Sequence, residues 1–235
     1  KIAELTGATQ LFLNTGPNLG LLLSKLGADG ILGATKIAEK LKQIGFINDV
    51  EKIGKDLVAK FGGQTMTDVY QTIGKADGKA NVHWVESFSN NVKTFNPLSD
   101  GSVGGAKGII REIQVAKAEN LVDSLNAGAL KIYDNFGKEI TDLDIVSNGI
   151  VREVKSPNSL ILDAQENSTT VFNVIKSKSK KLNDAKQFLP SGVSYNAIHF
   201  NIAKASDETV PQTVIDALNE AKAKGIIDDW KVVPV

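Results

Sequence analysis

The segment EITDLDIVSNGIVREVKS, residues 139–156, constrains the fold more than any other part of the chain. Asn148-Gly149 separates two runs in which apolar and polar residues alternate. This pattern predicts a β-hairpin with a type I′ turn, because that turn needs positive φ at both central residues and Asn-Gly supplies it. In such a turn Ser147 pairs with Ile150, which fixes the register of both strands.

Counting outward from the turn places Asp144 opposite Glu153 and Asp142 opposite Lys155. Because strand side chains alternate in direction, all four project from one face. Facing carboxylates about 5 Å apart at Cβ repel each other when both are ionised, and a shared divalent cation would turn this repulsion into attraction. Oxygen ligands suit Mg²⁺ or Mn²⁺, and Lys155 would neutralise charge on a phosphate under attack. The hairpin therefore predicts a site for phosphodiester hydrolysis.

The remaining pattern of the C-terminal half predicts alternating helices and strands. An amphipathic run ends at Ala127-Gly128, where glycine suits the position after a helix, and apolar periodicity assigns the later elements. The expected elements are a helix at 108–126, strands at 129–136, 139–146 and 150–154, a helix at 170–189, a strand at 194–202, a helix at 211–224 and a short strand at 230–233.

The N-terminal half has a different character. Residues 8–60 repeat apolar positions near the helical period, which predicts two or three helices. The turn-rich segment NPLSDGSVGG at 96–105 predicts a linker. We therefore expect a mainly helical module with a linker at 1–103, followed by an α/β domain at 104–235. The apolar run Leu19 to Leu32 is too short, and too interrupted by charge, to span a bilayer.

Composition limits the chemistry. Of the 235 residues 42% are hydrophobic, enough for one large core or two modest ones. The formal net charge is zero, so a contact with nucleic acid needs a local basic patch. The lysine-rich helix at 170–189 supplies one, with Lys178, Lys180 and Lys181 as candidates for phosphate contacts; a solvated charged face is an equally open interpretation. The chain has no cysteine and two histidines, which argues against a zinc site.

The order of elements and the acidic hairpin resemble the PD-(D/E)XK nuclease superfamily over residues 108–202. The resemblance is carried by Asp144, eight intervening residues and then Glu153-Val154-Lys155, between a preceding helix and a following α-β pair. It implies an α-β-β-β-α-β nuclease domain with a mixed central sheet. Asp144, Glu153 and Lys155 would be catalytic, and the two acids would bind the metal.

The resemblance also implies a glutamate from the helix that precedes the first strand. Glu119 occupies the matching place as a catalytic and metal-binding residue, with Glu112 as the reserve candidate. The sequence departs from the family pattern because leucine, not proline, precedes Asp144. Asp142 could replace Asp144 as the metal ligand in a shifted register.

A nuclease behind a helical module, in a chain that starts at Lys1 without an initiator methionine, is similar to the toxin tips of contact-dependent growth inhibition proteins and other bacterial polymorphic toxins. This resemblance implies a piece of a larger secreted or cell-surface protein that acts in the cytoplasm of a target bacterium. It implies tRNA or DNA as substrate, with tRNA favoured by family precedent. It also implies a cognate immunity protein and an inner-membrane receptor for the N-terminal translocation module.

Three other interpretations stay open. The charged hairpin face could be a solvated surface with cross-strand ion pairs. The domain could be a non-catalytic module that binds a basic partner. It could also be a housekeeping nuclease of the DNA repair or restriction type.

Overall fold

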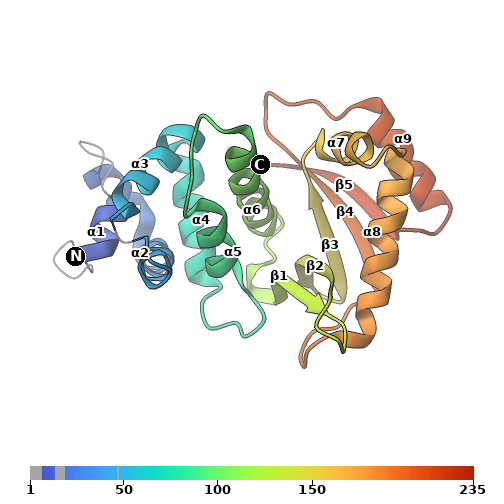
Figure 1. Cartoon of the computed structure of the whole chain (residues 1–235), viewed down its shortest axis with the longest axis horizontal. Coiled ribbons are helices and arrows are strands. Elements are labelled where there is room, and N and C mark those ends of the chain that lie inside the picture. The colour runs from blue at the N-terminus through green and yellow to red at the C-terminus, as the bar shows by residue number, and fades with distance from the viewer. Residues whose placement is uncertain (1–6, 14–18, 47) are drawn as a thin grey trace. The chain divides into compact units, whose positions relative to one another are not determined.

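The structure, a computed structural model, describes residues 7–13, 19–46 and 48–235 and divides into two compact units (Figure 1). The helical unit comprises Lys1–Gly78 and His83–Lys117, and the sheet unit comprises Lys79–Val82 and Ala118–Val235. The change between units falls after Lys117 and not after residue 103, because the helix that begins at Asp100 groups with the helical unit.

The helical unit is built from amphipathic helices. In α3 the buried residues Val50, Ile53 and Leu57 recur every three or four positions, which is the helical period. No helix in the described ranges is long and apolar enough to cross a membrane. The helices of this unit are α1 (Gly7–Phe12), α2 (Leu19–Gln43), α3 (Val50–Phe61), α4 (Gly63–Lys75), α5 (Trp84–Val92) and α6 (Asp100–Ala118).

Two glycines let α2 and α4 approach until their backbones touch. A Cβ atom on Gly33 would lie 2.0 Å from the carbonyl oxygen of Tyr70, and one on Gly74 would lie 1.8 Å from that of Asp29. Any larger residue would push the helices apart, so these glycines are required by packing.

The expected linker at 96–105 is wrong in its second half. Residues 100–105 form the first turns of α6, despite three glycines in that stretch. Helix propensity is a weak preference that tertiary packing overrides. Here the packing comes from the apolar residues Ala106, Ile109, Ile110 and Ile113, which are all buried on α6.

The sheet unit contains a five-stranded mixed sheet in the order β1-β2-β3-β4-β5 (Figure 1). The first three strands pair antiparallel, and β4 and β5 continue the sheet in parallel with β3. The expected α/β class is confirmed. The strands are β1 (Leu125–Tyr133), β2 (Glu139–Ser147), β3 (Ile150–Lys155), β4 (Ala197–Lys204) and β5 (Asp229–Pro234).

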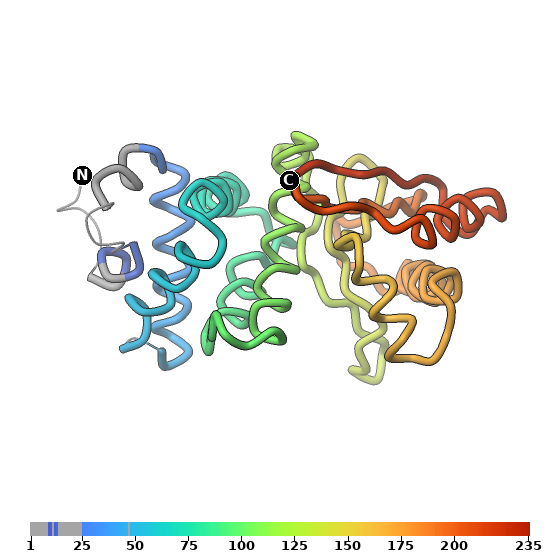
Figure 2. The backbone as a smooth tube through the Cα atoms, turned by 90° about the horizontal axis from the view of Figure 1, so that it is seen from above, coloured from blue at the N-terminus to red at the C-terminus, as the bar shows by residue number. Residues whose placement is uncertain are grey.

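Helices α7 (Ser159–Glu166), α8 (Val171–Ala185) and α9 (Gln212–Ala223) complete the sheet unit. Figure 2 follows this part of the backbone from β1 to the end of β5, which lies beside β4. Apolar residues of all three helices share one buried cluster with Val151 of β3 and with Ile198 and Phe200 of β4. Since Val151 pairs with Ile198 and Glu153 with Phe200, the helix-covered face of the sheet is also the face of Glu153.

Two boundaries differ from expectation. Helix α6 ends at Ala118, and Asn120 takes the left-handed conformation (φ 53°) that was expected of Gly128. β1 consequently begins at Leu125 instead of Ala129. Helix α7 was not expected from the sequence.

The first assigned pairs of the acidic hairpin are confirmed, because Ser147 pairs with Ile150 and both Asn148 and Gly149 have positive φ.

The left-handed conformation of Gly149 (φ 73°) leads to a stability prediction. Gly149→Ala should lower the free energy of unfolding of the sheet unit by roughly 1–2 kcal/mol, because an L-residue is strained there. Asn148→Gly is the matched control and should change stability by less than about 0.5 kcal/mol. Urea unfolding followed by Trp230 fluorescence, in a Trp84→Phe background, reports on this unit alone. Equal effects of the two substitutions would contradict the turn assignment.

Candidate active site

The β2–β3 hairpin brings two acidic side chains together, Asp144 and Glu153, which we call the acid pair. The pairing of β2 with β3 ends at Ile145–Arg152, and Asp144 and Glu153 are the next residues of the two strands beyond that pair. The backbone N–H of Val154 donates to Oδ2 of Asp144 at 2.7 Å, which holds this carboxylate against β3. Asp144 is 5% exposed and Glu153 is 1% exposed. The acid pair is therefore buried, which excludes the interpretation of a solvated sheet face.

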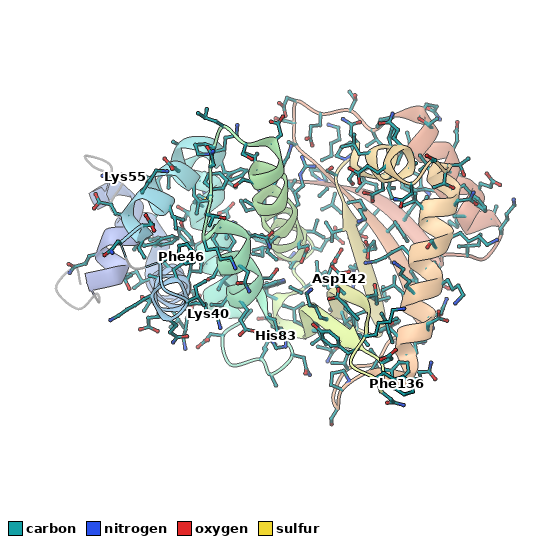
Figure 3. The ribbon with its side chains drawn as sticks, in the orientation of Figure 1. Lys40, Phe46, Lys55, His83, Phe136 and Asp142 are labelled. Atoms are coloured by element: carbon teal, nitrogen blue, oxygen red, sulfur yellow. The ribbon has the colours of Figure 1, made fainter. Side chains whose placement is uncertain are left out.

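Two lysines from different elements pair with Glu153. Nζ of Lys155, at the end of β3, lies 3.2 Å from Oε1, and Nζ of Lys178, from α8, lies 3.1 Å from Oε2. Lys178 also donates to Oδ1 of Asp142 at 2.6 Å, and Lys155 lies 3.8 Å from Oδ2 of Asp163 on α7. Figure 3 draws these side chains and labels Asp142. The cluster thus joins two strands and two helices.

The environment sets the charge of each group. Burial, and then repulsion from Glu153 and Asp142, raises the pKa of Asp144 well above its ordinary value of 3.8. Attraction to Glu153 outweighs burial and raises the pKa of Lys155. Burial opposes the charge of Lys178, but Glu153, Asp144 and Asp142 together raise its pKa. Both lysines are therefore cationic at neutral pH, whereas ionisation of Asp144 is disfavoured.

The structure gives Lys178 a different place from the one expected. We predicted a contact with a phosphate backbone, but its side chain is only 18% exposed and pairs with Glu153 and Asp142. Burial alone would raise the pKa of Asp142, yet Lys178 lowers it. The sequence pattern missed this role because nothing local relates Lys178 of α8 to Asp142 of β2, 36 residues earlier.

Glu119 does not join the acid pair, which corrects the sequence expectation. It lies in the turn after α6 and pairs with Lys231 of β5. It also acts electrostatically on Arg152. Burial lowers the pKa of Arg152 overall, and the nearby charge of Glu119 partly opposes that change. Arg152 and Glu153 are successive strand residues, so they project to opposite faces of the sheet. Glu119 therefore lies on the wrong side, and the reserve candidate Glu112 belongs to the helical unit.

The two acids do not gain a third acidic neighbour in metal-binding geometry. In the described part of the chain, no three His, Cys, Asp or Glu side chains form a group that could hold a metal ion. Any cation at this site would rest on the acid pair, completed by water or substrate oxygens.

A cleft of about 790 Å³ opens between α7 and α8, beside the cluster. Lys155 and Lys178 belong to its lining, and Asp163 is the one acid among the lining residues. The other charged residues of the lining are Lys176, Lys180 and Lys181, and its neutral polar residues are Asn167, Thr169, Asn173 and Ser177. This α7–α8 cleft is therefore strongly cationic and rich in hydrogen-bonding groups.

Some lysines of α8 form ion pairs with carboxylates of the protein, and others do not. Lys180 pairs with Asp184 on the helix surface. Lys176 and Lys181 are exposed and form no ion pair with any residue that the structure describes. The expected basic surface on this helix is present, and its unpaired charges lie at Lys176 and Lys181.

No protein-family model, curated protein sequence or solved structure matches this chain. The functional argument therefore depends on the site itself.

Asp144 and Asp142 should affect stability in opposite directions. A carboxyl group whose pKa is raised by folding binds its proton more tightly in the folded state, so it destabilises the fold as pH rises above the unfolded value. Asp144→Asn should therefore stabilise the sheet unit at pH 8, by about 1 kcal/mol, with a gain that vanishes towards pH 4. Asp142→Asn, the control, should destabilise at pH 8, because folding lowers the pKa of Asp142. Urea unfolding across this pH range tests both, and a loss of stability in Asp144→Asn at pH 8 would contradict the assignment.

Proposed function

We propose that the sheet unit is a metal-dependent endonuclease of the PD-(D/E)XK kind, which hydrolyses phosphodiester bonds in nucleic acid. The observation that carries the proposal is the buried acid pair flanked by Lys155 and Lys178, two lysines that also line a cationic cleft. Facing carboxylates, a neighbouring lysine and a path for phosphates are the groups that this hydrolysis requires.

The donor set fits Mg²⁺ or Mn²⁺. Asp144 and Glu153 offer hard oxygen ligands, and Mg²⁺ is commonly held by one or two carboxylates with water or phosphate completing its shell. The pKa of Asp144 is raised first by burial and then by repulsion from Glu153 and Asp142, and a bound cation would offset that repulsion. A bound cation would lower the pKa of a water molecule and polarise the phosphate.

The lysines have separate tasks in this proposal. Lys155 lines the cleft and would neutralise the charge that develops on the phosphate in the transition state. Lys178, which bridges Glu153 and Asp142, would hold the carboxylate of Glu153 in its orientation. Asp142 keeps a half-exposed side chain at the edge of the cluster and remains the alternative ligand to Asp144.

The cleavage assay tests the proposal directly. Purified protein should cut total tRNA or plasmid DNA in Mg²⁺ or Mn²⁺ and lose this activity in EDTA. Glu153→Gln and Lys155→Ala should each lower the rate by about 100-fold or more, as losing an electrostatic group in a catalytic site does.

Matched controls come from the C-terminal end of α9, where Glu220 and Lys224 form an exposed ion pair. Glu220→Gln and Lys224→Ala make the same chemical changes away from the cluster and should retain full activity. Cleavage that survives EDTA, or that persists in Glu153→Gln, would contradict the proposal.

One observation favours a second candidate, a non-catalytic module that binds a partner protein. Both carboxylate oxygens of Glu153 are already paired with lysines, as in a purely structural ion-pair network. Intact tRNA and DNA in every metal, together with a folded protein, would select this alternative.

The biological context proposed for the nuclease is a bacterial toxin, carried to the target-cell cytoplasm as part of a larger surface protein and neutralised by an immunity protein. Its helical unit would act in translocation through an inner-membrane receptor. The support is the pairing of a helical unit with a unit that carries the candidate site.

Induced expression in a bacterium without an immunity protein tests this context. The wild-type chain should stop growth, Lys155→Ala should be tolerated, and the control Lys224→Ala should still stop growth. A housekeeping nuclease would leave growth unaffected in all three strains, which would separate the toxin from the repair or restriction alternative.

A further inference from the structure

We infer that the α7–α8 cleft receives one unpaired strand of nucleic acid and excludes a duplex, so that the substrate is cut where it is single-stranded. The inference rests on the proposed nuclease activity and names the form of substrate that this site accepts. Its support is the charge and the size of the cleft and the burial of Glu153 beside it.

The charge of the cleft indicates a polyanionic ligand. Five lysines against one acid line it, and Lys176 and Lys181 on α8 are unpaired in the described structure. Lysines spaced along one helix can follow successive phosphates of a strand. Asn167, Thr169 and Asn173 add neutral donors and acceptors near the start of α8, where backbone N–H groups also favour an anion.

The size of the cleft excludes a duplex. A protein usually reads duplex DNA by inserting a protruding helix into a groove about 12 Å wide. Here the lysines of α8 line a concave space of about 790 Å³ that α7 closes on the other side. A space of this volume is that of a site for a small ligand, and it holds a few nucleotides of one strand.

The depth of the site leads to the same conclusion. Glu153 is 1% exposed, and the lysines that pair with it, Lys155 and Lys178, line the cleft. A phosphate on the outside of a duplex would reach only exposed lysines of the cleft such as Lys180 and Lys181. An unpaired strand, or a nucleotide turned out of its stack, is thin enough to reach the lysine pair.

The lining also indicates how the strand is recognised. None of its residues is aromatic, and Leu160 and Val174 are its apolar members. Base stacking on aromatic rings, the usual source of affinity that does not depend on phosphates, is therefore missing from the cleft. Binding should depend on phosphate contacts, tolerate any base sequence and weaken steeply with salt.

The test measures binding separately from cleavage. The full chain in EDTA is titrated, by fluorescence anisotropy, into a labelled mixed-sequence RNA strand, the same sequence as DNA, and each strand annealed to its complement. The double variant Lys176→Ala/Lys181→Ala removes the unpaired cations of the cleft. The control Lys138→Ala/Lys222→Ala removes two exposed lysines of the same unit outside it.

The expected result is tighter binding of both single strands than of either duplex. The cleft variant should weaken single-strand binding. The slope of its plot of log affinity against log salt concentration should become shallower by about 1.4, since each phosphate contact contributes about 0.7. The control should match the wild type.

Equal affinity for duplex and single strand would overturn the inference. Displacement of the strand by polyaspartate at equal charge concentration would also overturn it, because it would indicate an acidic protein ligand. Cleavage without strand preference would overturn this inference alone, and strand preference without cleavage in Mg²⁺ or Mn²⁺ would overturn the nuclease proposal alone.

Discussion

The carboxylate of Glu153 is buried. A buried carboxylate is tolerated only when cations or hydrogen-bond donors pair with its oxygens. Three features of the sheet unit follow from this requirement. The hairpin brings Asp144 close enough to act on Glu153 electrostatically, the end of β3 brings Lys155 to one oxygen, and α8 lies across the sheet so that Lys178 reaches the other. The cost of burying such a cluster is large, and a residue set retained at that cost is typical of functional sites more than of structural cores.

Positive and negative charges are distributed unevenly around Glu153. The cluster contains four carboxyl groups, those of Asp142, Asp144, Glu153 and Asp163, against the two cations Lys155 and Lys178. Burial, followed by repulsion from Glu153 and Asp142, raises the pKa of Asp144. Only one helical turn away on α8 the sign reverses, because the remaining lysines of the cleft outnumber its acids. The proposed nuclease would use this contrast, with the acid pair suiting a cation and the neighbouring lysines of the cleft suiting phosphates.

Local chemistry explains which parts of this arrangement could be predicted. The hairpin turn depends on two adjacent residues, Asn148 and Gly149, whose conformational preferences are intrinsic. The register of the acidic hairpin next to the turn could therefore be predicted from the sequence. The helices at 171–185 and 212–223 could be predicted for a similar reason, because the periodic spacing of their apolar residues is a local feature of the sequence. Predictions failed where two signals competed. Asn120 and Gly128 both suit the end of a helix, and the glycines at 101–105 indicated a linker although the apolar residues behind them continue the helix.

The sequence alone determined that Asp142, Asp144, Glu153 and Lys155 share one face of a hairpin, because strand alternation and one turn fix that arrangement without help from the rest of the chain. Only the tertiary structure decided what lies against that face. Packing of α8 turned an apparently solvated surface into a buried cluster and brought Lys178 into it, and α7 supplied the second wall of the cleft. It also placed Glu119 across the sheet, beside Lys231. The physical reason is that a periodic pattern specifies the direction of a side chain relative to its own element, whereas its partners depend on which apolar faces meet when the elements pack together.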